Sequence, residues 1–271
     1  MDSLKSVETH FAFGKNWGSY ATLIDRARID EAKKALLKLI PADEFRGRSF
    51  LDIGCGSGLH TLAAIELGVA RVLAVDLDPD SVATARAVLS SHGMSVPWSA
   101  EVVSVFDLDP RRHGTFDIVY SWGVLHHTGA MWEAVSKAAA IVAPGGLLAI
   151  ALYRRTRHVT FWKVEKRLYA HAPRFVQRAI AACYVIAFRL AMLAAGRSFR
   201  DYTANYKSSR GMDFSHDVHD WLGGYPYESA LAGEVEGRLA AFGFKPERVF
   251  ALSQEPVFKF GCDEYVYRKR G

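Results

Sequence analysis

The chain has 271 residues, of which 50% are hydrophobic, 23% charged and 12% aromatic. This composition excludes a disordered, collagen-like or disulfide-scaffold chain, and the length allows one elaborated domain or two small ones. Cys55, Cys183 and Cys262 are too widely spaced for a zinc or CxxC motif and leave an odd number for pairing. Because residues 1–10 also lack a signal-peptide pattern, we expect a cytoplasmic protein with reduced thiols.

The net charge of +5 is unevenly distributed. Residues 154–210 contain 13 Lys and Arg against two acids, a net charge of +11, whereas the rest of the chain has 21 basic and 27 acidic residues. A mildly acidic body therefore carries one strongly basic segment, and an anionic partner is expected to meet that segment.

The predicted elements alternate between strands and helices. An amphipathic helix over 19–40 is followed by strands over 49–53, 71–76, 101–106, 116–121 and 147–152, with helices that begin at Leu59, Asp80 and Met131. A helix over 230–242 and strands over 245–252 and 264–268 come last. Strand and helix in alternation predict an α/β protein with a doubly wound, seven-stranded, mostly parallel sheet.

Three parts of the chain follow from this pattern. We predict an N-terminal helical cap over 1–45, a core sheet over 46–153 and 230–271, and a helical, basic and aromatic insertion over 154–229, directly after the fifth strand. Within the insertion, residues 179–196 are apolar but hold Arg189 and are short for a membrane span. We expect a helix packed in its own domain, with a partner subunit or a lipid-like substrate as the alternatives.

A glycine-rich turn follows the first predicted strand. In FLDIGCGSGLH, residues 50–60, Gly54, Gly56 and Gly58 let backbone amides approach a ligand at a helix N-terminus. The spacing is GxGxG rather than the GxGxxG of dinucleotide-binding loops. Asp52, two residues before the first glycine, would repel a pyrophosphate and could hold the ammonium of an amino-acid group.

Residues 50–152 resemble the class I S-adenosylmethionine-dependent methyltransferases, which have a Rossmann-like fold. The resemblance rests on the GxGxG turn, on Asp76 at the end of the second strand, on Asp107 in VVSVFD, on FDIVYSWGVLHH and on Pro144-Gly145-Gly146 before the fifth strand. It implies that S-adenosyl-L-methionine is the cofactor, that Asp76 takes the ribose hydroxyls, and that Asp107 takes the adenine amino group with Phe106 stacked beside it. The implied cofactor-binding residues are Asp52, Gly54, Cys55, Gly56, Gly58, Asp76, Leu77, Phe106, Asp107 and Ser121.

A narrower resemblance extends over most of the chain. FAFGKNW, WGVLHHTGAMW, RGMDFSHDVHDWLGGYPYE and GCDEYVYRKR are similar to bacterial methyltransferases described as quinone-pathway O-methyltransferase-like. Residues 11–20 offer aromatic side chains, Trp17 among them, together with the cation of Lys15 and the amide of Asn16. We expect this segment to close over the cofactor, or else to pack as a surface staple on the following helix.

Two adjacent histidines are the candidate catalytic residues. A hydroxyl acceptor generally needs a base, and His126 and His127 follow the fourth strand on the side where strand ends meet ligands. By resemblance, His127 matches the histidine of the LEH motif of the quinone-pathway enzymes, while His126 replaces its glutamate. The alternative is that one histidine caps the next helix and the other packs.

The insertion provides the candidate acceptor pocket. Arg210, Trp221, Tyr225 and Tyr227 combine aromatic walls with polar groups, which suits a small-molecule acceptor or one at a membrane surface. Residues 216–220 hold two His and two Asp, but not at a known metal spacing, so we expect no metal. RNA methylation remains an alternative because basic and aromatic residues occur together, although the Asn/Asp-Pro-Pro-aromatic motif is absent. The third hypothesis is a cofactor-binding protein without catalysis or a membrane-surface adaptor, and the oligomeric state stays open.

Overall fold

The computed structural model describes residues 21, 23–94, 96–204, 206, 214–251 and 261–271. The strands are β1 Ser49–Ile53, β2 Arg71–Asp76, β3 Trp98–Val102, β4 Phe116–Trp122, β5 Val142–Tyr153, β6 Phe244–Phe250 and β7 Cys262–Lys269. The helices are α2 Arg26–Leu39, α3 Leu59–Glu66, α4 Pro79–Ser91, α5 Pro110–His113, α6 Met131–Ala140, α7 Val159–His171, α8 Arg174–Ala194, α9 Phe199–Ala204, α11 Phe214–Gly223 and α12 Ala232–Ala241.

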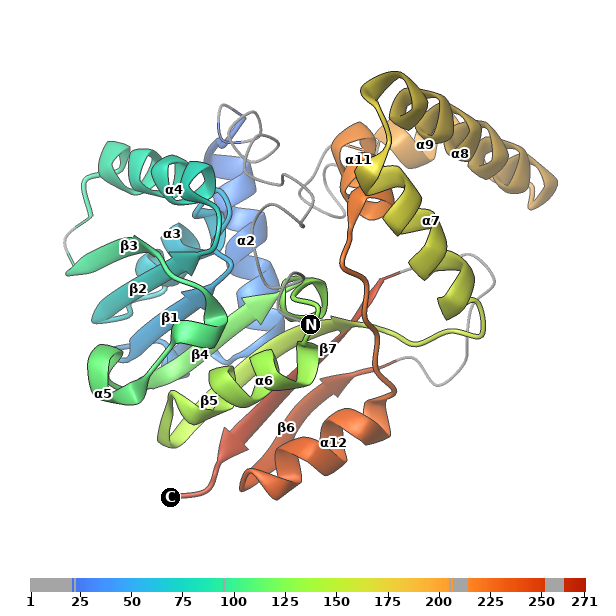
Figure 1. The fold of residues 1–271 in the computed structure, drawn as a ribbon. Coiled ribbons are helices and arrows are strands. Elements are labelled where there is room, and N and C mark those ends of the chain that lie inside the picture. The colour runs from blue at the N-terminus through green and yellow to red at the C-terminus, as the bar shows by residue number, and fades with distance from the viewer. Residues whose placement is uncertain (1–20, 22, 95, 205, 207–213, 252–260) are drawn as a thin grey trace.

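The strands form one sheet in the order β3-β2-β1-β4-β5-β7-β6 (Figure 1). β1 to β5 run parallel, and β7 pairs antiparallel with both β5 and β6. The predicted doubly wound, seven-stranded sheet is thus confirmed. Because the strand order reverses between β1 and β4, the loops after these two strands diverge and leave the crevice in which open α/β sheets bind ligands.

Both faces of the sheet are covered by helices, which explains why its inner strands are apolar throughout. One core packs α2 and α3 against β1, β2 and β4, and a second packs α6 and α12 against the opposite face. α2 begins at Arg26 because the Asp25 carboxylate accepts a hydrogen bond from the Arg28 backbone N–H.

The third strand differs from its predicted bounds. β3 is Trp98–Val102 rather than 101–106, because Ser104 caps a 3₁₀ turn at Val105–Asp107 that bends the chain away from the sheet. Pro144-Gly145-Gly146, predicted as a turn before the fifth strand, lies inside β5. Gly146 is required there, because a Cβ would lie 2.8 Å from the Asp117 carbonyl oxygen of β4.

The helices α7, α8, α9 and α11 form a group beyond the end of β5 (Figure 1). The chain leaves the sheet and re-enters it at one point, since Arg154 and Ala230 form a parallel bridge. The Ala230 N–H donates to the Tyr153 carbonyl at 2.9 Å, and the Arg155 N–H donates to the Ala230 carbonyl at 2.9 Å. The helical group is therefore attached to the sheet through two adjacent segments of the chain, one leaving β5 and one returning at Ala230.

α8 corrects the prediction for residues 179–196. The helix is longer than predicted, with 21 residues, and by length and composition it could cross a membrane. Only Met192 is buried among its residues, so the expected packing against its own domain is limited to one side of the helix. One side of α8 contacts α7 and α11, and the other side faces outward.

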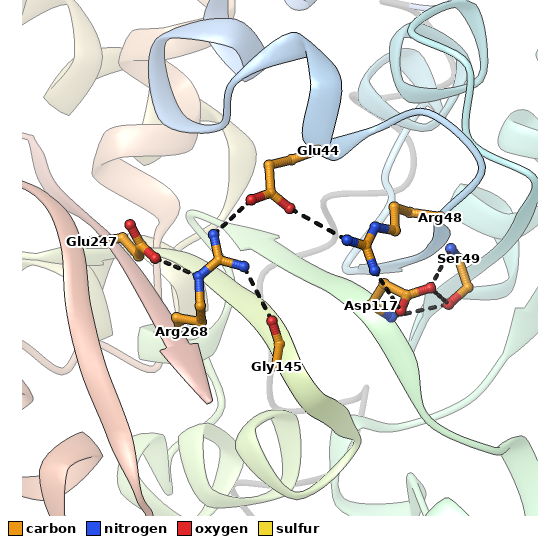
Figure 2. Close-up of polar contacts among 7 residues, drawn as sticks. All are labelled: Glu44, Arg48, Ser49, Asp117, Gly145, Glu247 and Arg268. Carbon is orange, nitrogen blue, oxygen red and sulfur yellow. Dashed lines mark hydrogen bonds and ion pairs between the residues drawn. The ribbon is translucent and has the colours of Figure 1, made fainter. Parts of the chain in front are cut away.

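A polar network joins the amino ends of β1, β4 and β5 to the carboxyl end of β7 (Figure 2). The Asp117 carboxylate accepts hydrogen bonds from the Ser49 N–H at 2.8 Å and the Ser49 hydroxyl at 2.7 Å. The Arg268 guanidinium pairs with Glu44 at 2.7 Å and with Glu247, and donates to the Gly145 carbonyl at 3.1 Å. These contacts fix the edge of the sheet opposite the ligand-binding loops.

Asp117→Ala should destabilise the protein by about 1–3 kcal/mol at neutral pH, because it leaves the buried Ser49 donors unpaired. Partial burial raises the pKa of Asp117, but the Ser49 hydrogen bonds and the nearby Arg48 and Arg71 outweigh it and lower the pKa below 3.8. The loss should therefore be present above pH 3.8 and shrink as the pH falls below it. Urea unfolding at several pH values measures the loss of stability in this variant and in the control Asp43→Ala, whose side chain is exposed. Equal losses in the two variants would contradict a stabilising role for the Asp117–Ser49 hydrogen bonds.

Candidate active site

The glycine-rich turn after β1 is tied to the end of β2. The N–H groups of Gly54 and Cys55 donate to the Val75 carbonyl at 2.7 and 3.1 Å. Gly54, Gly56 and Gly58 have φ values of 78°, 52° and 77°, a region that side chains disfavour. This backbone turns sharply from β1 into α3 and places the first amides of α3 at the crevice.

Gly54 also joins the turn after β1 to the turn after β4. A Cβ on Gly54 would lie 2.4 Å from Val124 Cγ2, so the Val124 side chain fills the space that a side chain here would need. The neighbouring Ser121 hydroxyl is fully buried and donates to the Ile53 carbonyl at 3.0 Å. Two contacts therefore hold the Val124 turn against the glycine-rich turn.

Two carboxylates flank the glycine-rich turn. Asp52 is buried and accepts a hydrogen bond from the Thr61 hydroxyl at 2.5 Å. Burial raises the pKa of Asp52 to about 7; the Thr61 bond opposes this shift, and the nearby Asp76 charge adds to it. Asp76 is oriented by the N–H groups of Gly56 and Asp78, each at 3.0 Å, and burial raises its pKa as well.

The remaining cofactor candidates surround the same crevice. Cys55 is buried, which raises the pKa of its thiol, so this residue contributes packing and a backbone amide rather than a thiolate. Leu77 and Phe106 are half-buried and Asp107 is exposed, all in the loops after β2 and β3. Phe106 packs against the core on one side, which fixes its ring next to Asp107. Lys15 and Trp17 lie outside the described residues.

His127 lies in the 3₁₀ turn Leu125–His127, directly after Val124. Its Nδ1 is 2.8 Å from the Pro226 carbonyl oxygen. A carbonyl can only accept, so Nδ1 carries the hydrogen, and in the neutral ring Nε2 is the nitrogen with the lone pair. This tautomer is the one that a general base at Nε2 requires.

His126 has a different environment from its neighbour. Its ring is fully buried, and its Nδ1 accepts from the Tyr153 N–H at 3.3 Å. Burial, together with the nearby His127 and Lys166, lowers the pKa of His126 well below 6.5. This buried, neutral ring packs beside His127, and a catalytic role for His126 stays a prediction.

An aromatic pocket adjoins the two histidines. The Tyr153 ring centroid is 5.1 Å from that of His127, 5.3 Å from that of Trp221 and 5.3 Å from that of Tyr227. Tyr153, Trp221 and Tyr227 line a pocket together with Arg154, Thr156, Trp162 and Gly261, and it has room for about one water molecule. Two of the predicted acceptor residues, Trp221 and Tyr227, are therefore brought together with β5 and α7.

A buried cation lies behind the walls of the pocket. Lys166 has no exposed surface, its Nζ is 3.8 Å from the Trp221 ring centroid, and it donates to the Trp221 carbonyl. Burial lowers the pKa of Lys166 and raises that of the adjacent Glu165. Rings of Tyr153 and Tyr227 lie within 6 Å of the same ammonium, at 5.9 and 5.4 Å.

The other predicted residues lie elsewhere. Tyr225 does not line the pocket and instead packs edge-on against His171, with ring centroids 5.6 Å apart. Arg210 lies outside the described residues. In the part of the chain that the structure describes, no cluster of metal-ligating side chains occurs. His219 instead contacts the Tyr169 hydroxyl through Nδ1 at 2.7 Å.

Sequence reasoning did not identify Tyr153, Thr156 or Lys166 as site residues. Tyr153 ends β5 at the carboxyl edge of the sheet, a position that could have drawn attention to it. Lys166 carries no such signal, because a lysine in a basic helix is expected to be solvated. Its burial depends on α11 packing over α7, which the sequence does not reveal.

Gly54→Ala should destabilise the protein more than Gly243→Ala, a matched control with φ of 83° and nothing within 4 Å of the added Cβ. Both changes place alanine at positive φ, but only the first overlaps Val124, which should add about 1–3 kcal/mol. Urea unfolding measures the difference, and Val124→Ala should restore part of the loss in the Gly54→Ala background. Equal losses at the two glycines would disprove the close contact.

Comparison with known proteins adds independent information. Residues 51–150 match the family model described as "Methyltransferase domain". Over 110 residues the chain is 38% identical to a ubiquinone biosynthesis O-methyltransferase from Xanthomonas campestris, a match that covers 41% of this chain and 45% of that protein. The chain thus spans less than half the length of the curated relatives that it matches.

Solved structures show the same fold at low sequence identity. The magnesium protoporphyrin IX methyltransferase from Synechocystis PCC 6803, with bound SAH, is 14% identical, with a TM-score of 0.53 over 90% of this chain and 83% of that chain. The cyclase SpnF is 14% identical, with a TM-score of 0.56 over 89% of this chain and 80% of that chain. The sheet, the glycine-rich turn with its two carboxylates, and the family match together show that the chain carries a class I S-adenosylmethionine-dependent methyltransferase domain.

Proposed function

We propose that this protein transfers a methyl group from S-adenosyl-L-methionine to a hydroxyl oxygen of a small-molecule acceptor. The observation that carries the proposal is the packing of Val124 against Gly54, which joins the glycine-rich turn to the turn that ends at His127. O-methylation is further supported by the ubiquinone biosynthesis O-methyltransferases that the chain matches over 110 residues. The acceptor itself is not identified by these matches.

The site fits the cofactor. The buried Asp52 carboxylate has a raised pKa, as expected for an anion that lacks a cation, and the ammonium of the methionine part would supply one. Asp76, held by two backbone N–H groups, would accept from the ribose hydroxyls, and Asp107 with Phe106 would hold the adenine. When bound, S-adenosylmethionine supplies an electrophilic methyl group on a sulfonium.

His127 would remove the acceptor proton. Methyl transfer to oxygen leaves a proton on the former hydroxyl, and a base within hydrogen-bonding reach must take it. The Pro226 carbonyl holds the hydrogen on Nδ1 and thereby directs the basic Nε2 to this task. His126, buried beside it, packs its ring against Tyr153, with ring centroids 3.8 Å apart.

The pocket favours an aromatic hydroxyl acceptor. Tyr153, Trp162, Trp221 and Tyr227 offer ring faces and edges, on which a planar acceptor can stack. Burial lowers the pKa of Lys166 behind these rings, and in its protonated form this side chain would favour an acceptor whose oxygen becomes anionic. Because the pocket has room for about one water molecule, acceptor entry requires α7 and α11 to move away from β5.

A labelling experiment tests the proposal. The purified protein is incubated with donor labelled in its methyl group and with a cell extract that has been separated into small molecules, lipids, RNA and protein. Label should enter a small-molecule or lipid fraction and resist the mild alkali that cleaves methyl esters. Asp76→Ala, which removes the ribose contacts, sets the background. Label in RNA would replace the proposal by the nucleic-acid alternative, and no label with intact donor binding would indicate a protein that only binds the cofactor.

Donor binding should depend on pH through Asp52. Its pKa of about 7 means that below this pH an ammonium can bind only after the carboxyl loses its proton. The affinity for S-adenosylhomocysteine should fall by up to about tenfold per pH unit below pH 7, and Asp52→Asn should bind weakly with a smaller slope. Calorimetric titrations between pH 6 and about 7.5 measure this; an unchanged slope in Asp52→Asn would rule out the ammonium contact.

His127→Gln should slow methyl transfer by about 10²- to 10⁴-fold, because it removes the base and retains a hydrogen-bonding side chain. Its affinity for S-adenosylhomocysteine should stay at the wild-type value. Turnover is measured with the labelled fraction as acceptor, and exposed His92→Gln serves as the control. Normal turnover in His127→Gln would exclude His127 as the base.

A further inference from the structure

α8 is apolar on the side that packs against the rest of the protein. Ile180, Tyr184 and Val185 contact a small core that contains Tyr169 of α7 and Leu222 of α11. Together with Ala181, which packs on the same core, these residues cover a broad arc of about 140° around the helix. In a helix at the surface of a globular protein, the opposite face should then be polar.

The outward face of α8 is apolar as well. Phe175, Ile186, Leu190 and Leu193 are 74%, 59%, 60% and 71% exposed. These positions lie within about 60° of one another around a helix of 3.6 residues per turn, and the positions between them along this stripe include exposed Ala179, Ala182 and Cys183. A continuous exposed stripe of this kind marks a surface that is covered by a partner.

α7 repeats the arrangement. Phe161, Val164 and Leu168 are 62%, 55% and 64% exposed at spacings of three and four residues. Cations accompany both stripes; Lys163, Arg167, Arg174, Arg178 and Arg189 are all exposed. The acids of residues 154–210 are only Glu165, which is largely buried, and Asp201.

We propose that α7 and α8 dock this protein onto the surface of a bilayer that contains anionic phospholipids, with α8 in the plane of the interface. Exposed apolar side chains flanked by Lys and Arg are the chemistry that such a surface binds, since the side chains enter the acyl boundary and the cations pair with the headgroups. A second copy of the chain fits less well, because it would place one segment of charge +11 against another.

The same charges argue against α8 as a membrane span. Arg189 lies within the helix on its outward face, next to Leu190, where a span would bury it in hydrocarbon. The inward face stays packed on α7 and α11, so insertion across a bilayer would have to break that core. A helix that lies in the plane of the interface keeps its inward contacts with α7 and α11 and leaves Arg189 near the headgroups.

Docking would also place the aromatic pocket at the membrane. α7 carries Trp162 and Lys166 on the pocket side and Phe161, Val164 and Leu168 on the outward side. An acceptor with a lipid-like tail could then pass from the bilayer to the pocket along a single helix. The docking inference itself does not rest on the proposed methyl transfer, because it is measured without donor or acceptor.

The test is co-sedimentation of the purified full chain with vesicles of phosphatidylcholine alone and with vesicles that also contain phosphatidylglycerol. We expect binding to the anionic vesicles that weakens with added salt. Leu190→Glu should weaken it by about tenfold or more, and Arg174→Ala and Arg178→Ala by about fivefold each. Val249→Glu, at a 44% exposed apolar position on the distant strand β6, should bind as the wild type does.

Thermal melting checks that differences in vesicle binding do not come from misfolded variants. Each substitution is at an exposed position and should leave the melting temperature unchanged. Three results would overturn the proposal. The first is equal vesicle binding by the wild type and Leu190→Glu. The second is protein that stays with the vesicles after alkaline carbonate extraction, as a membrane-spanning protein would. The third is a dimer in solution that depends on Leu190 and does not bind vesicles.

Discussion

The close approach of Val124 to Gly54 is the contact on which the rest of the site depends. A side chain at Gly54 would occupy the space that Val124 fills, so the cofactor loop and the histidine turn can meet only if this position is glycine. The hydrogen bond from the Ser121 hydroxyl to the Ile53 carbonyl joins the same two chain segments. In the proposed reaction, this junction between the neighbouring strands β1 and β4 would position both the donor and the base.

The two ends of the sheet serve different purposes. At the amino ends of β1 and β4, Asp117 and Ser49 satisfy each other's polar groups and stabilise the fold. At the carboxyl ends, Asp52 and Asp76 are carboxylates that burial disfavours in the ionised form, and this costs stability at neutral pH. Such a cost at a crevice is typical of a binding site, because a cation brought by the ligand can offset it.

The helical group brings the aromatic pocket to the end of β5. The chain enters and leaves this group at one place beside β5, and its last segment also contacts the turn after β4, where His127 Nδ1 lies 2.8 Å from the Pro226 carbonyl oxygen. α7 is the element shared by two surfaces, with Lys166 on its buried side and Leu168 on its exposed side. This arrangement suits an enzyme that combines a general donor site with a specific acceptor site.

The sequence by itself determined the sheet, the glycine-rich turn and the two carboxylates, because apolar runs, positive-φ glycines and acids at strand ends are local signals. It also placed His126 and His127 after the fourth strand, and by resemblance it favoured His127 as the base. The tertiary structure gave them different environments, since the Pro226 carbonyl, 99 residues away, sets the tautomer of His127 while the Tyr153 amide binds the buried His126. The bounds of β3, the burial of Lys166 and the exposure of α8 were likewise decided by which elements pack together, a long-range property that neither spacing nor composition encodes.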